Sequence, residues 1–205
     1  MSIWTPTLQT LIPSVFWKGK NSTLHLTYDD GPHPATTPIL LEVLRSYDIK
    51  TTFFFLGHQA QQFPDLVRQA HAEGHVIGNH SFDHPSLIFR SPQFIAGQID
   101  RTTDCIRHIT GSATMLFRPP YGYFGPTLLR TAARRRHRLV LWSLDSEDWR
   151  RGTSAEISQR ICRKARPGSI ILLHENEHTV SKAADILKRT IDTLLSSFSF
   201  AAIHS

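Results

Sequence analysis

The chain has 205 residues with a mass of 23.3 kDa, and its content of 40% hydrophobic and 20% charged residues is typical of a soluble globular protein. Its two cysteines, Cys105 and Cys162, are far apart and form no CxxC pair, which argues against a disulfide framework and against a cysteine zinc site. The net charge of +6 permits an anionic partner. The basic run at Arg130–Arg138 has no interleaved aromatic residues, however, and favours a solvated helix end over a nucleic-acid interface.

The amino-terminal segment shows no targeting pattern. The first twenty residues lack a basic region followed by an apolar stretch and a small-residue cleavage site, and Pro6 and Pro13 interrupt their apolar character. We therefore expect no signal peptide, no transmembrane helix and a cytoplasmic location. Residues 1–22 are expected to form an N-terminal extension that packs on a single domain over residues 23–205, since no linker or low-complexity tract divides that region.

Predicted strands and helices alternate along the domain. Apolar runs predict seven strands, at Leu24–Tyr28, Thr51–Leu56, His75–Ile77, Met115–Phe117, Leu139–Trp142, Ser169–Leu173 and Phe198–Ile203. Between these strands the sequence predicts helices. The first begins with Thr37 as N-cap before Pro38, the second runs from Pro64 to Gly74, and the third runs from Ser91-Pro92 to Gly111. The fourth is capped by Thr153 or Ser154, and the last covers residues 183–195. This alternation predicts βα units around a parallel sheet, as a closed or nearly closed seven-stranded barrel, with an open doubly wound sheet as the alternative.

Polar residues follow most of these strands directly. They are Asp29 and Asp30 after the first strand, His80 and His84 after the third, Arg118 and Tyr121 after the fourth, Asp145, Asp148 and Trp149 after the fifth, and His174 at the end of the sixth. In parallel α/β barrels the functional groups lie at the carboxyl ends of the strands. The sequence therefore predicts that these residues meet on one face of the barrel.

The histidine pair suggests a metal site. His80 and His84 are four residues apart, so that on one helical turn both rings would lie on the same side. Taken alone, this spacing also fits two unrelated surface histidines. A metal needs an anionic ligand as well, which one of the paired aspartates can supply, and two histidines with one carboxylate leave positions open for catalysis. The second aspartate then stays free to accept a proton, since a cation relieves the repulsion between the two.

Three further residues have alternative interpretations. His174 ends an apolar strand, where a histidine is usually a satisfied core residue, but beside a metal it suits a general acid. Arg118 could form an ordinary strand-end salt bridge, or the prolines after it could hold a rigid arm that orients a catalytic carboxylate. Tyr121-Gly122 could present a backbone N–H to an oxyanion.

Together these motifs resemble the polysaccharide deacetylases of carbohydrate esterase family 4. Its five motifs occur in order as "TYDDGP", "HSFDHP", "RPPYG", "LDSEDW" and "IILLH", and Tyr28 replaces the usual phenylalanine of the first. The resemblance covers residues 23–174 and implies a single-domain distorted (β/α)7 barrel, with residues 23–205 as its catalytic domain. It also implies a divalent metal, foremost zinc, with cobalt, nickel, iron or manganese compatible.

The same resemblance implies roles for individual residues. The metal ligands would be Asp30, His80 and His84, and the general base would be Asp29, oriented by Arg118. The general acid would be His174, oriented by Asp148, with Asp145 as the less favoured partner. The Tyr121 N–H would hold the oxyanion, and the substrate would contact Tyr121, Trp149 and Leu172. The implied reaction is metal-dependent hydrolysis of an acetyl group, foremost N-acetyl, on an amino-sugar oligo- or polysaccharide. The alternatives are a hydrolase of a non-sugar C–N bond and an inactive glycan-binding module, and no nucleic-acid partner is expected.

Overall fold

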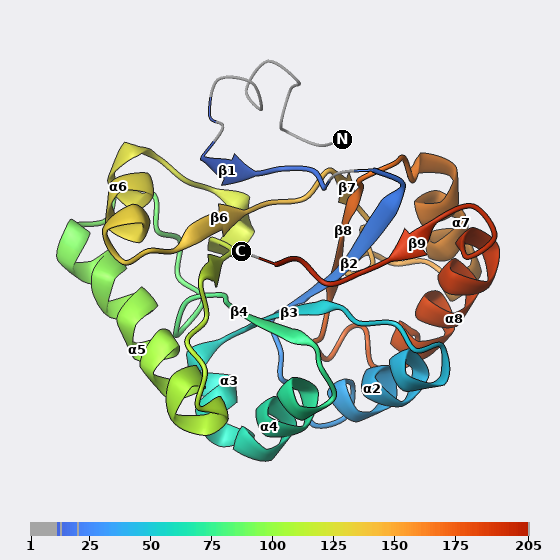
Figure 1. Cartoon of the computed structure of the whole chain (residues 1–205), viewed down its shortest axis with the longest axis horizontal. Helices are drawn as coiled ribbons and strands as arrows, with labels where there is room; N and C mark the ends of the chain where they lie inside the picture. The colour runs from blue at the N-terminus through green and yellow to red at the C-terminus, as the bar shows by residue number, and fades with distance from the viewer. Residues whose placement is uncertain (1–11, 13, 20, 205) are drawn as a thin grey trace.

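The computed structural model describes residues 12, 14–19 and 21–204, whose strands form one parallel sheet that curls on itself (Figure 1). The strands are β1 (Val15–Phe16), β2 (Thr23–Asp29), β3 (Thr52–Phe55), β4 (Val76–Asn79), β5 (Leu116–Phe117), β6 (Arg138–Val140), β7 (Leu144–Asp145), β8 (Ile170–His174) and β9 (Ser199–Phe200). Their order is β1-β6-β5-β4-β3-β2-β8-β7, and β9 pairs with β2. The predicted distorted (β/α)7 barrel is confirmed, and among the described residues its hydrogen-bonded path stays open between β1 and β7.

Helices surround the sheet and connect successive strands (Figure 1). They are α2 (Thr37–Ser46), α3 (Gly57–Gln62), α4 (Pro64–Ala72), α5 (Pro92–Thr110), α6 (Pro126–Arg134), α7 (Ser154–Lys164) and α8 (Ala183–Leu194), with a short 3-10 helix η1 (Pro120–Gly122). The sequence punctuation explains several ends. Ser91 caps α5 by accepting from the Phe94 N–H, Gly111 closes it at φ 72°, and Thr153 forms a capping box with Glu156 at the start of α7.

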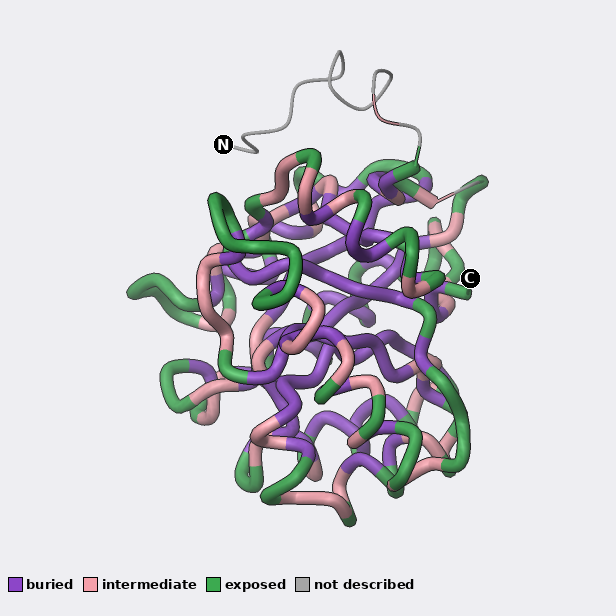
Figure 2. The backbone as a smooth tube through the Cα atoms, turned by 90° about the vertical axis from the view of Figure 1, so that its left-hand side faces the viewer, coloured by how far each residue is buried: buried purple, intermediate pink, exposed green. Residues whose placement is uncertain are grey.

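Two apolar clusters form the core. In β3, Phe53 and Phe55 belong to the cluster that packs against α2, α7 and α8, whereas Phe54 lies on the other face of the strand, in a cluster that fills the barrel interior and extends to α5 and α6. This division follows from the alternation of side chains along a strand. Figure 2 shows buried segments through the middle of the molecule and exposed segments mostly at its periphery. Polar residues on the interior side of a strand end are thereby aimed at the mouth of the barrel.

The predicted strand at Leu139–Trp142 is wrong in its extent. The chain forms β6 beside β1 and β5, bends, and then forms β7 beside β8. At the bend the chain changes its hydrogen-bonding neighbour from β1 to β8. The Leu141 N–H donates to Phe16 O in β1 at 2.9 Å, and the Ser143 N–H donates to Ile170 O in β8 at 3.1 Å. β1, α3 and the start of α6 were not predicted from the sequence. The predicted last strand is confined to β9, at the amino end of β2.

The amino-terminal segment is described only in part. Residues 1–11, 13 and 20 lie outside the described residues, so the division at residue 22 stays a prediction. Within the described part, Trp17 follows β1 and is buried in the same apolar cluster as Phe54. No helix in the described ranges combines the length and the apolar character needed to cross a membrane.

Candidate active site

The site is centred on Asp29, the last residue of β2. Its side chain shares the barrel-interior face with Thr27 and is almost fully buried. Arg118 donates from Nη1 to Asp29 Oδ1 at 2.7 Å and to Thr27 Oγ1 at 2.8 Å. Burial raises the pKa of Asp29 above its usual value, although the charges of Arg118 and His174 oppose the shift. Asp29 is therefore an oriented carboxylate of increased basicity.

Arg118 is held as rigidly as the carboxylate it contacts. Its side chain is 0% exposed, and its guanidinium carbon lies 4.1 Å from the centroid of the Phe54 ring. Nε donates to Val140 O and Nη2 donates to Leu141 O, both at 3.3 Å. These contacts fix the direction of the guanidinium, so that it can hold Asp29 in one orientation.

His174 lies beside Asp29 on the neighbouring strand, β8, where the two residues are register partners. Asp148 accepts from the His174 backbone N–H at 2.8 Å, and its other oxygen lies 2.7 Å from His174 Nδ1. Burial alone would lower the pKa of His174, but the charge and hydrogen bond of Asp148, with the charges of Asp30 and Asp29, raise it to about 9. Asp145 instead accepts from the Glu147 N–H. The histidine is thus a cation at neutral pH, with Nε2 not engaged by Asp148.

Asp30, His80 and His84 converge next to Asp29. One ligand atom from each lies within 4.8 Å of the others, and Asp30 Oδ1 is 3.7 Å from His80 Nε2 and 3.4 Å from His84 Nε2. His80 Nε2 is also 3.7 Å from Asp29 Oδ2. Two imidazoles and one carboxylate at these separations suit a divalent cation of the first transition series or zinc.

The expectation that His80 and His84 lie on one helical turn is wrong. Both belong to the non-helical connection between β4 and α5, in which Ser81 (φ 71°) and His84 (φ 57°) are left-handed. The rings nevertheless meet, with centroids 5.0 Å apart, because the connection folds back on itself. The sequence spacing matched a helix by coincidence, and the loop backbone produces the same juxtaposition.

The state of His80 fits metal ligation. Its Nδ1 lies 2.7 Å from Arg118 O, which can only accept, so Nδ1 carries the proton and the Nε2 lone pair faces Asp30. Burial lowers the pKa of His80 to about 3, helped by the nearby His84 and only partly opposed by Asp30. A neutral imidazole with a directed lone pair is the form that binds a metal.

The remaining predicted residues lie at the rim and the floor of the site. Tyr121 is left-handed (φ 61°) and 55% exposed, and its ring packs edge-on against His84 with centroids 4.7 Å apart. Trp149 follows Asp148 and is 48% exposed. Leu172 is buried on the interior face, two residues before His174. Their roles toward a substrate stay predictions.

Several supporting residues were missed in the sequence analysis. Gln98 Oε1 accepts from the Phe82 and Asp83 N–H groups at 2.8 and 3.0 Å, and so ties the histidine loop to α5. Asn176 donates to Asp30 Oδ2 at 3.3 Å. Gln98 had a detectable signal, since it is a polar residue three positions after Ile95 on the apolar stripe of its helix. Asn176 had none.

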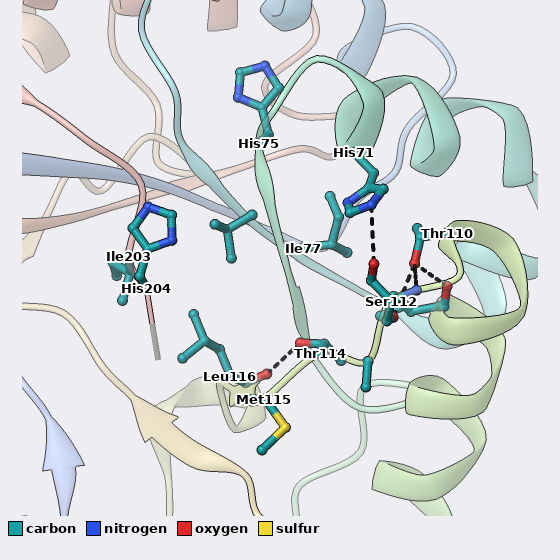
Figure 3. Close-up of a pocket in the computed structure, with 13 residues that line it drawn as sticks. His71, His75, Ile77, Thr110, Ser112, Thr114, Met115, Leu116, Ile203 and His204 are labelled. Carbon is teal, nitrogen blue, oxygen red and sulfur yellow. Dashed lines mark hydrogen bonds between the residues drawn. The ribbon is translucent and has the colours of Figure 1, made fainter.

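Cavities lie at both ends of the barrel. One of about 380 Å³ adjoins the metal-binding residues and is lined by Asp30, His33, Leu56, Gln59, His84, Glu175, Asn176, Glu177 and His178. Another, of about 190 Å³, lies at the amino ends of β4 and β5, and Figure 3 shows His75, His71 and His204 around it. Of these two cavities, only the first is lined by metal-binding residues, Asp30 and His84.

The comparisons with known proteins match this geometry. A family model described as polysaccharide deacetylase matches residues 18–140, which is more than half of the chain. The chain belongs to the polysaccharide deacetylase family. The expected family and the expected class of enzyme are thereby confirmed.

Relatives and solved structures extend the match. A chitooligosaccharide deacetylase of Azorhizobium caulinodans is 41% identical over 155 residues, covering 75% of this chain and 74% of the relative. A peptidoglycan-N-acetylglucosamine deacetylase of Bacillus cereus is 38% identical over 149 residues, covering 73% of this chain but 54% of the relative. The solved structure of the peptidoglycan N-acetylglucosamine deacetylase Bc1960, in complex with an N-hydroxybenzamide, superimposes with a TM-score of 0.92 at 31% identity, covering 98% of this deacetylase and 95% of that chain.

Proposed function

We propose that this deacetylase removes the N-acetyl group from an amino sugar of an oligo- or polysaccharide by water attack and releases acetate. The observation that carries the proposal is the placement of Asp29 and His174 as register partners on adjacent strands, beside a cluster that suits a divalent metal. Each of the two has its own buried partner, Arg118 or Asp148. A base and an acid on the same side of a metal cluster are the groups needed for metal-assisted acyl hydrolysis.

Asp29 is proposed to be the general base. It accepts the proton of the attacking water at the oxygen not bound to Arg118, while Arg118 keeps the carboxylate aimed at the site. Because burial raises the pKa of Asp29, the carboxylate holds this proton better than an exposed aspartate would.

His174 is proposed to be the general acid. Its raised pKa of about 9 keeps the imidazole protonated at neutral pH, and Asp148 at Nδ1 leaves Nε2–H to protonate the departing amine. Cleavage of the amide C–N bond then yields acetate and a free amino sugar. We propose that the Tyr121 backbone N–H donates to the oxyanion and that Trp149, Leu172 and the Tyr121 ring contact the acetyl group or its sugar.

Asp30, His80 and His84 would hold the metal, which we propose to be zinc, with cobalt, nickel, iron or manganese compatible with the same ligands. When bound, such an ion polarises the acetyl carbonyl and lowers the pKa of water. The fixed tautomer of His80 supports this assignment.

The substrate class follows from the relatives. The two relatives reported above are named for chitooligosaccharides and for the N-acetylglucosamine of peptidoglycan, so we propose an N-acetylated amino-sugar glycan as the substrate. The cytoplasmic location stays a prediction from the sequence alone.

A second candidate is an inactive member of the family. The solved structure of BA3943 of Bacillus anthracis, described as a CE4 family pseudoenzyme, superimposes with a TM-score of 0.84 at 25% identity, covering 96% of this chain and 69% of that chain. This chain keeps both the base Asp29 and the acid His174, which favours activity. A hydrolase of a non-sugar C–N bond is the third candidate and shares the same residues.

The test is release of acetate from acetylated chitooligosaccharides, xylan and peptidoglycan fragments. It compares metal-stripped protein, protein with zinc or cobalt restored, and Asp29→Asn. We expect metal-dependent release that falls by about 10²-fold or more in Asp29→Asn, because the carboxylate that accepts the proton is gone. Tight metal binding without acetate release from any of these glycans would favour the non-sugar hydrolase or the inactive module.

A further inference from the structure

Glu175 is a buried carboxyl group that the proposed reaction does not use. It follows His174 directly and is 1% exposed. Its backbone N–H donates to Asp29 O at 2.8 Å, and its side-chain Oε2 accepts from Thr37 Oγ1 at 3.1 Å. A carboxyl group removed from water is costly unless it contributes a specific interaction, so the surroundings of Glu175 require an explanation.

The turn that carries Asp29 and Asp30 is built around this side chain. A Cβ atom at Gly31 would overlap Glu175 Oε2, so the backbone of the turn passes directly against the carboxyl group. Beyond the turn, the His33 N–H donates to Thr37 Oγ1 at 2.8 Å. Glu175 thus contacts the middle of the turn, binds its first residue through the main chain, and binds its far end through Thr37.

This arrangement determines where Asp30 lies. Asp30 stands between the residues tied to Glu175 and has a left-handed backbone at φ 74°, which is uncommon for a residue other than glycine and needs support from its surroundings. Asn176, the residue after Glu175, adds a bond to Asp30 Oδ2 at 3.3 Å. The end of β8 therefore supports Asp30 through two consecutive side chains.

We propose that Glu175 is a positioning residue for the metal site, whose side chain packs under the turn at Gly31 and sets the position of the Asp30 carboxylate. The inference rests on the metal site of the proposed function and adds a residue to it. Outer partners of metal ligands commonly change metal affinity or activity by about 10- to 100-fold when they are removed.

The experiment measures zinc affinity by competition with a chromophoric chelator, together with kcat and KM for acetate release and the melting temperature. The variants are Glu175→Ala and Glu175→Gln, since glutamine keeps the length of the side chain and an oxygen that accepts from Thr37. His75→Ala is the matched control, because it removes another buried polar side chain at the opposite end of the barrel (Figure 3). Thr37→Val, which breaks the link to His33, gives a second and milder variant.

We expect Glu175→Ala to weaken zinc binding about 10- to 100-fold and to lower kcat more than it raises KM. Glu175→Gln should stay within about threefold of the unaltered chain, and Thr37→Val should weaken zinc binding in the same direction by a smaller factor. His75→Ala should lower the melting temperature and leave zinc affinity unchanged. If Glu175→Ala does not fold, the comparison rests on Glu175→Gln and Thr37→Val.

Unchanged zinc affinity in folded Glu175→Ala would overturn the inference, and so would equal losses of zinc affinity in Glu175→Gln and Glu175→Ala. If the alanine variant does not fold, unchanged zinc affinity in Thr37→Val would overturn it. Because zinc affinity is read without a substrate, a chain that binds zinc but releases no acetate would count against the proposed function and still decide the role of Glu175. A chain that binds none of zinc, cobalt, nickel, iron and manganese would overturn the metal site and this inference with it.

Discussion

At the scale of single residues, the pKa values of Asp29 and His174 each depend on a buried partner of opposite charge beside the group. Arg118 faces Asp29, and Asp148 faces His174, both at 2.7 Å. His174 therefore holds its proton to about pH 9, while the charge of Arg118 limits the upward shift that burial gives the pKa of Asp29. Environments that separate the pKa values of a base and an acid assign their roles before any substrate binds.

The pairing of Asp148 with His174 predicts a change in the pH profile. Asp148→Asn removes the charge that opposes burial, so the pKa of His174 should fall below about 9. The alkaline limb of kcat/KM should then move to lower pH, and activity at neutral pH should fall by about 10²-fold or more. The measurement is kcat/KM between pH 5 and pH 10 on whichever glycan releases acetate. Asp145→Asn is the control, because Asp145 accepts only from the Glu147 N–H in the described hydrogen bonds, and an equal shift in both variants would contradict the assignment.

The residues of this site could be predicted from the sequence because short motifs carry them. Asp29, His80 and His174 each end or follow a strand, and parallel strands bring their carboxyl ends together. Asp148 is preferred over Asp145 as the partner of His174 because it directly precedes Trp149, and Asp148 is the residue whose Oδ1 lies 2.7 Å from His174 Nδ1. The bend between β6 and β7 could not be predicted, because the apolar run at Leu139–Trp142 continues across it.

At the scale of elements, the loops rather than the strands decide the geometry. The histidine loop after β4 was predicted to be a helical turn, but Ser81 and His84 adopt left-handed backbone, and Asn79 and Gln98 bind its N–H groups in place of helical carbonyls. Similarly, Thr36 rather than Thr37 occupies the N-cap position of α2, without a capping side-chain hydrogen bond, and the Thr37 hydroxyl instead contacts Glu175 and the His33 N–H. The distant partners of Thr37 leave no trace in local sequence, whereas Gln98 stands out as a polar residue on the apolar stripe of α5.

Gln98 provides a test of the histidine loop as an element. Gln98→Leu leaves the Phe82 and Asp83 N–H groups without their acceptor, at a cost of about 1–3 kcal/mol for a buried group. Because the loop then loses these two hydrogen bonds to α5 and keeps only its contacts with Arg101 of that helix, zinc affinity should fall by about tenfold. Urea unfolding and zinc competition measure the two effects separately.

The control for Gln98→Leu is Thr153→Ala, which removes the cap of α7 and costs about 1 kcal/mol. Since α7 does not contact the histidine loop through any described hydrogen bond, this variant should lose stability and keep its zinc affinity. Equal zinc affinity in both variants would show that the two hydrogen bonds to Gln98 do not position the loop.

At the scale of the whole molecule, the two ends of the barrel have different chemistry. The carboxyl ends of the strands carry the paired charges of the site, whereas the amino ends bury histidines such as His75 and His25. Burial lowers the pKa of both, and for His75 it lowers the pKa from 6.5 to about 4, with the charge of Lys50 adding to the shift. These histidines are neutral in the folded chain at neutral pH and become protonated more readily once the chain unfolds.

This difference predicts how stability depends on pH. The folded pKa of His75 lies below its unfolded value of 6.5, so the unfolded chain binds more protons, and the contribution of His75 is complete above pH 6.5 and is lost as the pH falls toward 4. Since one pKa unit corresponds to about 1.4 kcal/mol, the loss from this residue approaches about 3 kcal/mol at pH 4. Urea unfolding between pH 7 and pH 4, with chelator present, should therefore show a steeper decline for the unaltered chain than for His75→Gln. The catalytic end is the same in both proteins and cancels in the difference, so parallel curves would mean that protonation of His75 does not drive the loss of stability in acid.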